Sequence, residues 1–363
     1  AHDYQQAVAA SEVVLSRSRR TDDGQAVPSR WLSRLTNLLN GLPDQNGPAA
    51  LEGMMARGNR FISLASVLDI PTTSTKAARR PAPAPPSVIR PKKLSVTEIR
   101  TLIRDPYAIY AKHVLRLKPL SPLVPQPDAR LKGTIFHHIL EHFFALDADF
   151  SDRSLARRRL FDIAAAEFAR HVPWLATRAQ WIGHLEEIAD WLIETEQFRL
   201  AGSDPLAREV KGLFKVPGTQ MSVSGKADRI DRLKTGGLAI FDFKTGTLPS
   251  VKQIRHYDRQ LLIEAVMAKA GAFEDVPASP VQTVAYISVG RRPKTMPIDL
   301  KDGYDTVTVQ RELIELLSKF SSEGIGYISR RAMERERYEG DYDHLARFGE
   351  WDASEETTPQ PVR

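Results

Sequence analysis

The sequence predicts an α/β fold in which helices surround a small sheet. Apolar residues recur at helical spacing up to about residue 200, β-branched residues alternate over 208–243, and both patterns return further along the chain. The predicted core order is therefore helix, three strands, helix, strand. Extra helices are inserted before the strands, and a small helical segment precedes the core.

The individual elements follow from the same two periodicities. Apolar spacing predicts helices over 133–146, 155–170, 178–200, 253–270 and 304–320. Alternation predicts strands over 208–216, 221–233, 238–243 and 281–289, with a turn at Thr235-Gly236-Gly237 between the second and third. No internal repeat is visible.

Composition limits the classes of protein to consider. The 363 residues are 42% hydrophobic and 26% charged, and no stretch approaches the roughly 18 consecutive apolar residues that a membrane helix needs. Because no secretory signal pattern opens the chain, we expect a cytoplasmic protein without a membrane partner. The missing initiator Met predicts that the sequence is a piece of a longer protein.

Cysteine is absent, and its absence restricts the possible chemistry. Without it there are no disulfides, thiolate zinc sites, thiolate iron–sulfur clusters or cysteine nucleophiles. His and carboxylates remain as the only metal ligands to consider.

A proline-rich stretch divides the chain. Residues 1–70 read as helices, six prolines follow within 71–93 and predict an extended linker, and 94–363 form a second domain. Ser95 and Glu98 form a capping box that starts a helix running to about residue 117.

The positive charge is concentrated before that second domain. Residues 1–93 hold 13 Lys and Arg against 7 Asp and Glu, whereas the remainder holds 38 of each. DNA contacts in the second domain must therefore come from local clusters. The candidates are Arg229, Arg232, Arg255, Arg259, Arg291 and Arg292, for each of which solvated surface charge is the alternative.

Two predicted neighbouring strands end in acidic residues, Asp228 and Asp242, 14 positions apart. Adjacent strands lie about 4.8 Å apart, so these two carboxylates could share one divalent cation. Lys244 shares a face with Asp242, and the Phe243 backbone carbonyl could complete the coordination. An isolated Asp-x-Lys would predict an ordinary surface ion pair, but the apolar run 238–241 before it favours an active site.

Three ordered motifs give the sequence its resemblance to a known family. They are Gly-Thr-Ile-Phe-His-His-Ile-Leu-Glu (133–141), Gly-Lys-Ala-Asp-Arg-Ile-Asp (225–231) and Asp-Phe-Lys-Thr-Gly (242–246). Together they resemble the RecB-like PD-(D/E)XK nucleases. Residues 94–117 and 341–347 look like the AddB-type subunits of helicase–nucleases, and the resemblance covers about 94–352. Residues 1–93 resemble, more loosely, the end of a helicase-like region plus a linker.

The resemblance implies a fold and an activity. It implies a restriction-endonuclease-like core and a Mg²⁺-dependent deoxyribonuclease, with Mn²⁺ as a possible substitute. The substrate would be the 5′-ending single strand that an AddA-type helicase subunit unwinds during double-strand break repair. A nuclease-shaped DNA-binding or scaffold module with a decayed site is the alternative.

The resemblance also implies roles for single residues. His137, Asp228 and Asp242 would be metal ligands, and Lys244 the catalytic lysine. Gln260 keeps the family's glutamine, which would hydrogen-bond a phosphate or Lys244. Tyr257 is a candidate DNA contact, with plain helix surface as the alternative. Glu264 stands where many relatives have tyrosine, which puts the DNA contact of that turn in doubt. His138 and His142 share a helix face and form the rival metal pair.

A last departure concerns the iron–sulfur cluster that some relatives carry. This chain has Asp105 where the first cluster cysteine would fall, so it holds no such cluster. We expect packing of Leu102, Tyr107, Tyr110, Leu115 and the C-terminal segment to join the two ends of the domain instead.

Overall fold

The computed structural model describes residues 2–21, 24–73, 76–120, 123–145, 148–332 and 340–362. The chain divides into two compact units, 1–77 and 78–363. The first contains the helices expected there and a short hairpin that was not expected. Its elements are α1 (His2–Val8), β1 (Arg20–Thr21), β2 (Gly24–Gln25), α2 (Arg30–Asn40) and α3 (Gly47–Leu68).

The second half of the proline-rich segment belongs to the second unit, which corrects the linker expected over 71–93. Strand β3 (Pro83–Ala84) pairs in parallel with β10 (Gln360–Pro361). The buried Arg90 guanidinium donates to the carbonyls of Pro85, Phe320 and Ile325. Prolines lack N–H groups, but their carbonyls still accept hydrogen bonds, so this segment packs against the second unit although its regular elements, β3 and a 3₁₀ turn, are short.

The second unit is built on a six-stranded mixed sheet, which confirms the predicted α/β class. The order is β4-β6-β7-β8-β9, and β5 pairs with the other edge of β6. Its strands are β4 (Lys93–Ser95), β5 (Ser203–Lys215), β6 (Ser222–Leu233), β7 (Leu238–Lys244), β8 (Val281–Ser288) and β9 (Lys294–Ile298). The short outer strands β4 and β9 were not predicted.

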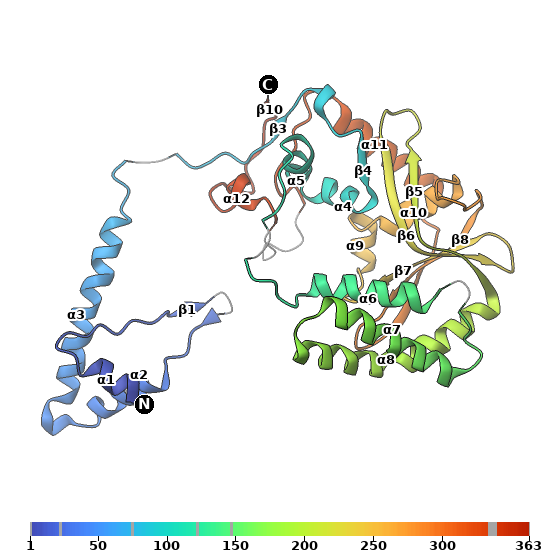
Figure 1. Cartoon of the computed structure of the whole chain (residues 1–363). Helices are drawn as coiled ribbons and strands as arrows, with labels where there is room; N and C mark the ends of the chain where they lie inside the picture. The colour runs from blue at the N-terminus through green and yellow to red at the C-terminus, as the bar shows by residue number, and fades with distance from the viewer. Residues whose placement is uncertain are drawn as a thin grey trace. The chain divides into compact units, whose positions relative to one another are not determined.

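Two separate clusters of buried apolar residues cover the two faces of the sheet. One joins the sheet to α6 (Ala129–Phe143), α7 (Arg153–His171) and α8 (Leu175–Gly202), which lie together in Figure 1. The other joins it to α4 (Val96–Arg104), α10 (Gln260–Lys269) and α11 (Thr306–Ser321). Leu146, the expected end of helix α6, lies outside the described residues.

Shorter helices connect these layers. The helix expected over 253–270 is two helices, α9 (Val251–His256) and α10, because the chain breaks at Tyr257–Arg259. The helix expected to reach residue 117 is likewise divided into α4, α5 (Pro106–Ile109) and a π-helical turn (Tyr110–Val114). Short 3₁₀ turns at Pro43–Gln45 and Ser87–Ile89 and helix α12 (Asp343–Ala346) complete the set. Among the described residues, no helix combines the length and apolar character needed to cross a membrane.

Strand β6 has a break in pairing along one edge, and this break positions the site. Its residues 222–224 pair with β4 and its residues 229–232 pair with β7, which leaves 225–228 without a strand partner on that edge. Gly225 lies in the break, where a Cβ atom would come within 3.0 Å of Val96 and 3.1 Å of Met267. The two strands that carry Asp228 and Asp242 therefore separate where those residues stand.

Candidate active site

Asp228 occupies the point where β6 and β7 separate. Its Oδ2 accepts a hydrogen bond from the Phe243 backbone N–H at 2.8 Å. This carboxylate oxygen takes the place that a backbone carbonyl of β6 would hold if the two strands remained paired. Asp228 is thereby fixed against β7, the strand that carries Asp242.

Asp242 and Lys244 form a hydrogen-bonded group with the first turn of α10. Lys244 Nζ lies 2.7 Å from Asp242 Oδ2 and 2.9 Å from Oδ1. Gln260 Nε2 donates to Asp242 Oδ1 at 2.8 Å, and Gln260 Oε1 lies 3.5 Å from Lys244 Nζ. The same amide donates to the buried Glu264 at 3.1 Å, so Glu264 extends this network.

A third acidic residue, Glu209 of β5, joins His137 and Asp228. One potential ligand atom from each of the three lies within 4.8 Å of the others, and His137 Nδ1 is 3.5 Å from Asp228 Oδ2. Glu209 has a φ of 47°, which is rare for a residue other than glycine and is typical of functional sites. Sequence analysis did not predict Glu209 as a site residue. The signal that could have found it is its position in β5, the strand that pairs with β6, which carries Asp228.

These donors fit a divalent cation. An imidazole nitrogen and several carboxylate oxygens converge at one edge of the sheet, where clustered negative charge favours an added cation. At this edge of the sheet, the cluster of mutually close atoms comprises His137, Glu209 and Asp228. The structure pairs Asp242 with Lys244 on the adjoining strand, and the Phe243 backbone interacts with both Asp228 and His137.

The protonation of the site follows from burial and from the crowding of carboxylates. Burial, and then the charge of Asp242, raise the pKa of Asp228 well above its ordinary value. Burial likewise raises the pKa of Glu264 well above its ordinary value, with Asp242 and Asp228 adding to the effect. Burial lowers the pKa of His137, which keeps its imidazole neutral and able to bind a cation.

The pKa of Lys244 is raised, although burial acts to lower it. Burial alone would lower its pKa, but the charge and hydrogen bond of Asp242, together with the charges of Asp228 and Glu264, raise the pKa above its ordinary value. Lys244 therefore stays an ammonium group at neutral pH.

Asp228→Asn should stabilise the metal-free protein more as the pH rises. Because the Asp228 pKa is raised on folding, the folded state binds its proton more tightly than the unfolded state does. That stability is present below the ordinary Asp pKa and is lost as the pH rises, whereas Asn cannot lose it. We expect the Tm difference, variant minus wild type, to increase from about pH 5 to about pH 8 in chelator. The exposed Asp204→Asn is the matched control, and a difference that shrank with pH would contradict the assignment.

Arg229 is fully buried, so the expectation that it contacts DNA is wrong. It donates to both oxygens of Asp231 at 2.7 Å and also pairs with Glu196 of α8. The alternation of β6 explains this, because Arg229 and Asp231 share a face that Asp228 does not. Arg229 and Asp231 belong to a structural charge network behind the site.

The other side chains predicted to contact DNA are exposed or partly buried. Arg232 is exposed and pairs with Leu238, at the end of β7 away from Asp242. Arg255 is exposed at the end of α9, and Arg259 forms an ion pair with Glu312 of α11. Tyr257 is partly buried, with the Arg104 guanidinium 5.4 Å from its ring centre.

Basic residues also lie near the end of the sheet that carries Asp242 and Lys244. Arg291 and Arg292 are exposed directly after β8, whose last residue, Ser288, pairs with Lys244. The charge of Arg291 acts on Lys132 of α6, the helix that carries His137. The rival pair of His138 and His142 does not form a cluster, since His138 faces Glu167 and His171 of α7 instead.

Hydrogen bonds join the two ends of the domain. Asp105 Oδ1 accepts from the Arg330 N–H at 2.9 Å, and Arg330 in turn pairs with Asp343. Leu102, Tyr107 and Tyr110 are buried, as expected. Leu115, by contrast, is 41% exposed and contributes little of this packing.

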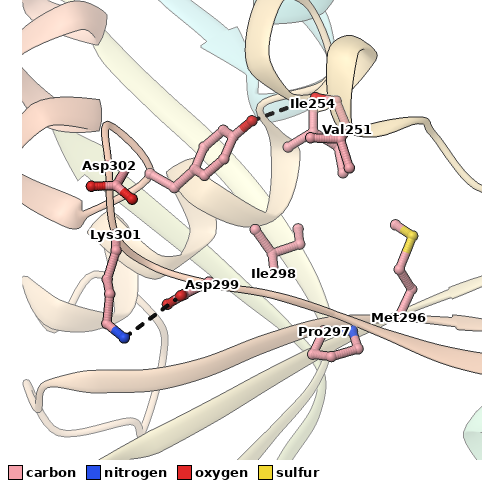
Figure 2. A pocket seen from close by; sticks show the side chains of 9 residues that line it. Val251, Ile254, Met296, Pro297, Ile298, Asp299, Lys301 and Asp302 are labelled. Atoms are coloured by element: carbon pink, nitrogen blue, oxygen red, sulfur yellow. Dashed lines mark hydrogen bonds and ion pairs between the residues drawn. The ribbon is translucent and has the colours of Figure 1, made fainter.

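A cavity of about 280 Å³ lies apart from the acidic edge of the sheet, since its lining includes neither Asp228 nor Asp242. Val251 and Ile254 of α9 face Met296 and Ile298 of β9 across it, with Asp299 and Lys301 at its rim (Figure 2). It contains none of the candidate catalytic groups. The acidic edge of the sheet, and not this cavity, therefore defines the candidate active site.

The sheet, its splayed acidic strands and the adjacent lysine have the arrangement of a PD-(D/E)XK nuclease. A model of the PD-(D/E)XK nuclease superfamily matches residues 93–351, and the chain belongs to this superfamily. An uncharacterised protein of Rickettsia bellii (strain RML369-C) is 30% identical over 190 residues, 52% of this chain and 23% of that protein. An ATP-dependent helicase/deoxyribonuclease subunit of Streptococcus mutans serotype c is 29% identical over 160 residues, 43% of this chain and 14% of that protein. The chain thus spans less than a quarter of the length of these relatives.

Proposed function

We propose that this chain is a Mg²⁺-dependent deoxyribonuclease that cleaves one DNA strand, from its 5′ end, after a helicase has unwound it. The observation that carries the proposal is the convergence of His137, Glu209 and Asp228 beside the Asp242–Lys244 pair. The similarity to an ATP-dependent helicase/deoxyribonuclease subunit supports action together with a helicase. On the resemblance of its motifs, the proposal extends to an AddB-like role in double-strand break repair, in the cytoplasm, with an AddA-type partner.

His137, Glu209, Asp228 and Asp242, with the Phe243 backbone carbonyl, are the residues that would hold the cation. When bound, a divalent cation lowers the pKa of a water and neutralises phosphate charge. A bound cation would replace the proton that the raised pKa of Asp228 keeps on its carboxylate. The neutral imidazole of His137 would bind the cation without first losing a proton.

Lys244 would stabilise the negative charge that develops on the phosphate during cleavage. Asp242 and Gln260 both contact its ammonium group, so its position is fixed before substrate arrives. Gln260 acts as a positioning residue, since its amide bridges Asp242 and Glu264 and holds α10 against the strand end.

DNA would follow the basic residues near this edge of the sheet. Arg255, Arg291 and Arg292 are exposed and lie on segments that follow β7 and β8. Arg259 is less suited to this role because Glu312 neutralises it. Since residues 94–363 carry no net charge, affinity would depend on these local contacts and on delivery by the helicase.

Lys244→Ala separates catalysis from metal binding. The carboxylates and His137 remain, so Mg²⁺ binding should persist or tighten once the competing ammonium is gone. Turnover on labelled single-stranded DNA should fall by about two orders of magnitude or more. Calorimetric Mg²⁺ titration and a cleavage assay on the same preparation give the two quantities.

Lys234→Ala is the matched control, because this exposed lysine lies in the turn between β6 and β7, away from Lys244. Near-normal cleavage by Lys244→Ala would reject the proposed chemistry and favour a decayed scaffold module. Loss of Mg²⁺ binding together with cleavage would instead mean that Lys244 holds the strand ends together.

A further inference from the structure

A second group of metal-binding side chains lies where helix α6 packs against α7. His138 of α6 faces Glu167 and His171 of α7, and the potential ligand atoms of the three residues all lie within 4.8 Å of one another. His138 Nδ1 is 3.8 Å and His171 Nε2 is 3.7 Å from the same oxygen, Glu167 Oε2.

These distances suit a shared cation better than hydrogen bonds. Both exceed the upper limit of about 3.2 Å for an N–H···O hydrogen bond. Two ligands on one tetrahedral zinc ion lie about 3.4 Å apart, which follows from metal–ligand bonds near 2.1 Å. A small change in side-chain torsion would bring both imidazoles to that separation.

The placement of the three residues also favours a site. Glu167 and His171 are four positions apart on one helix, so they share a face, and α6 supplies the third ligand. The Glu167 side chain is only 11% exposed, whereas the two histidine side chains are 47% and 41% exposed. The carboxylate is thus fixed by the surrounding protein, and solvent can reach the remaining coordination positions.

We propose that His138, Glu167 and His171 form a second metal site, which takes a borderline transition cation of the Zn²⁺ class. Two imidazoles and one carboxylate suit Zn²⁺, Ni²⁺ or Cu²⁺, whereas Mg²⁺ prefers oxygen ligands and retains its waters. The bound ion would join α6 to α7, and α6 carries His137 one residue before His138. The inference does not depend on nuclease activity.

The test must separate this site from the acidic edge, which also contains a histidine. Asp228→Asn, in the full chain, removes a ligand from the acidic site and leaves the α6–α7 residues intact. We expect this variant to bind Zn²⁺ in a calorimetric titration, and Zn²⁺ to raise its Tm. Glu209→Gln provides a second background if Asp228→Asn does not fold, as judged by circular dichroism.

Adding His171→Gln to either background should weaken Zn²⁺ binding at least about 100-fold, because loss of a direct ligand should exceed the cost of losing its outer-shell partner. Adding His142→Gln, an exposed α6 histidine outside the cluster, should leave binding unchanged. Co²⁺ should give visible absorption bands that His171→Gln removes. No Zn²⁺ binding in either background, or binding that His171→Gln leaves intact, would overturn the proposal.

Discussion

Asp242→Ala is expected to reduce Mg²⁺-dependent cleavage of single-stranded DNA by at least about three orders of magnitude. Asp242 combines two functions that no other described residue replaces. It would supply an oxygen to the cation, and it directly contacts the Lys244 ammonium and the Gln260 amide. A single truncation therefore disturbs both the cation and the group that stabilises the phosphate.

The fold should survive this change. Burial raises the pKa of Asp242, and burial followed by the charge of Asp242 raises the pKa of Asp228. The metal-free site therefore contains repulsion between carboxylates that the substitution relieves. Lys244 retains 31% exposure of its side chain and can be solvated. We expect the Tm of the metal-free variant to equal or slightly exceed that of wild type.

Asp242→Asn refines the experiment because it keeps the shape and one oxygen while it removes the charge. If charge is what the site requires, Asn should be nearly as inactive as Ala. Asp204→Ala, an exposed change in β5, is the matched control. An Asp242→Ala protein that cleaved DNA at near the wild-type rate, in a preparation free of host nuclease, would reject this edge of the sheet as the active site.

The sequence allowed the acidic strand ends to be identified because their signals are local. Asp228, Asp242 and Lys244 follow buried strand residues, and alternation alone puts Asp242 and Lys244 on one face. The structure brings these residues, His137 and Gln260 to one edge of the sheet. Glu209 was not predicted as a site residue because its position depends on a local left-handed backbone in β5, which no periodicity reveals.

Other features depended on contacts between distant parts of the chain. Arg229 could be read as a surface residue until its partner Glu196, 33 positions earlier, was located on α8. The segment 78–93 could be read as a linker because its hydrogen bonds go to residues around 320–330 and 360. The outer strands β4 and β9 are short, and short edge strands leave little pattern. Long helices and central strands, which carry many residues of one period, were predicted within a few positions.

The network that contains Arg229 has an excess of positive charge. Three guanidinium groups, from Arg199, Arg208 and Arg229, surround two carboxylates, from Glu196 and Asp231. Burial, and then the charge of Arg229, lower the pKa of Arg199 and of Arg208 to about 10. Removing Glu196 or Asp231 should therefore destabilise the fold most, because it increases the excess of buried positive charge.

Asp231→Ala should accordingly destabilise the protein more than Arg229→Met does. Asp231 accepts hydrogen bonds from Arg229, Arg208 and Ser203, so its removal leaves buried cations without a partner, at a cost of about 3–5 kcal/mol. After Arg229→Met, Glu196 keeps Arg199 and Asp231 keeps Arg208, which limits the loss to about 1–3 kcal/mol. Urea denaturation near neutral pH measures both.

The double variant gives the sharper result. Asp231→Ala with Arg229→Met restores the excess of one positive charge that the wild-type network has. Its loss of unfolding free energy should therefore be smaller than the sum of the two single losses, by about 1 kcal/mol or more. Asp204→Asn controls for a change of charge on the same pair of strands. If Arg229→Met proved the more costly single change, packing of its long side chain, and not charge balance, would govern the stability of this layer.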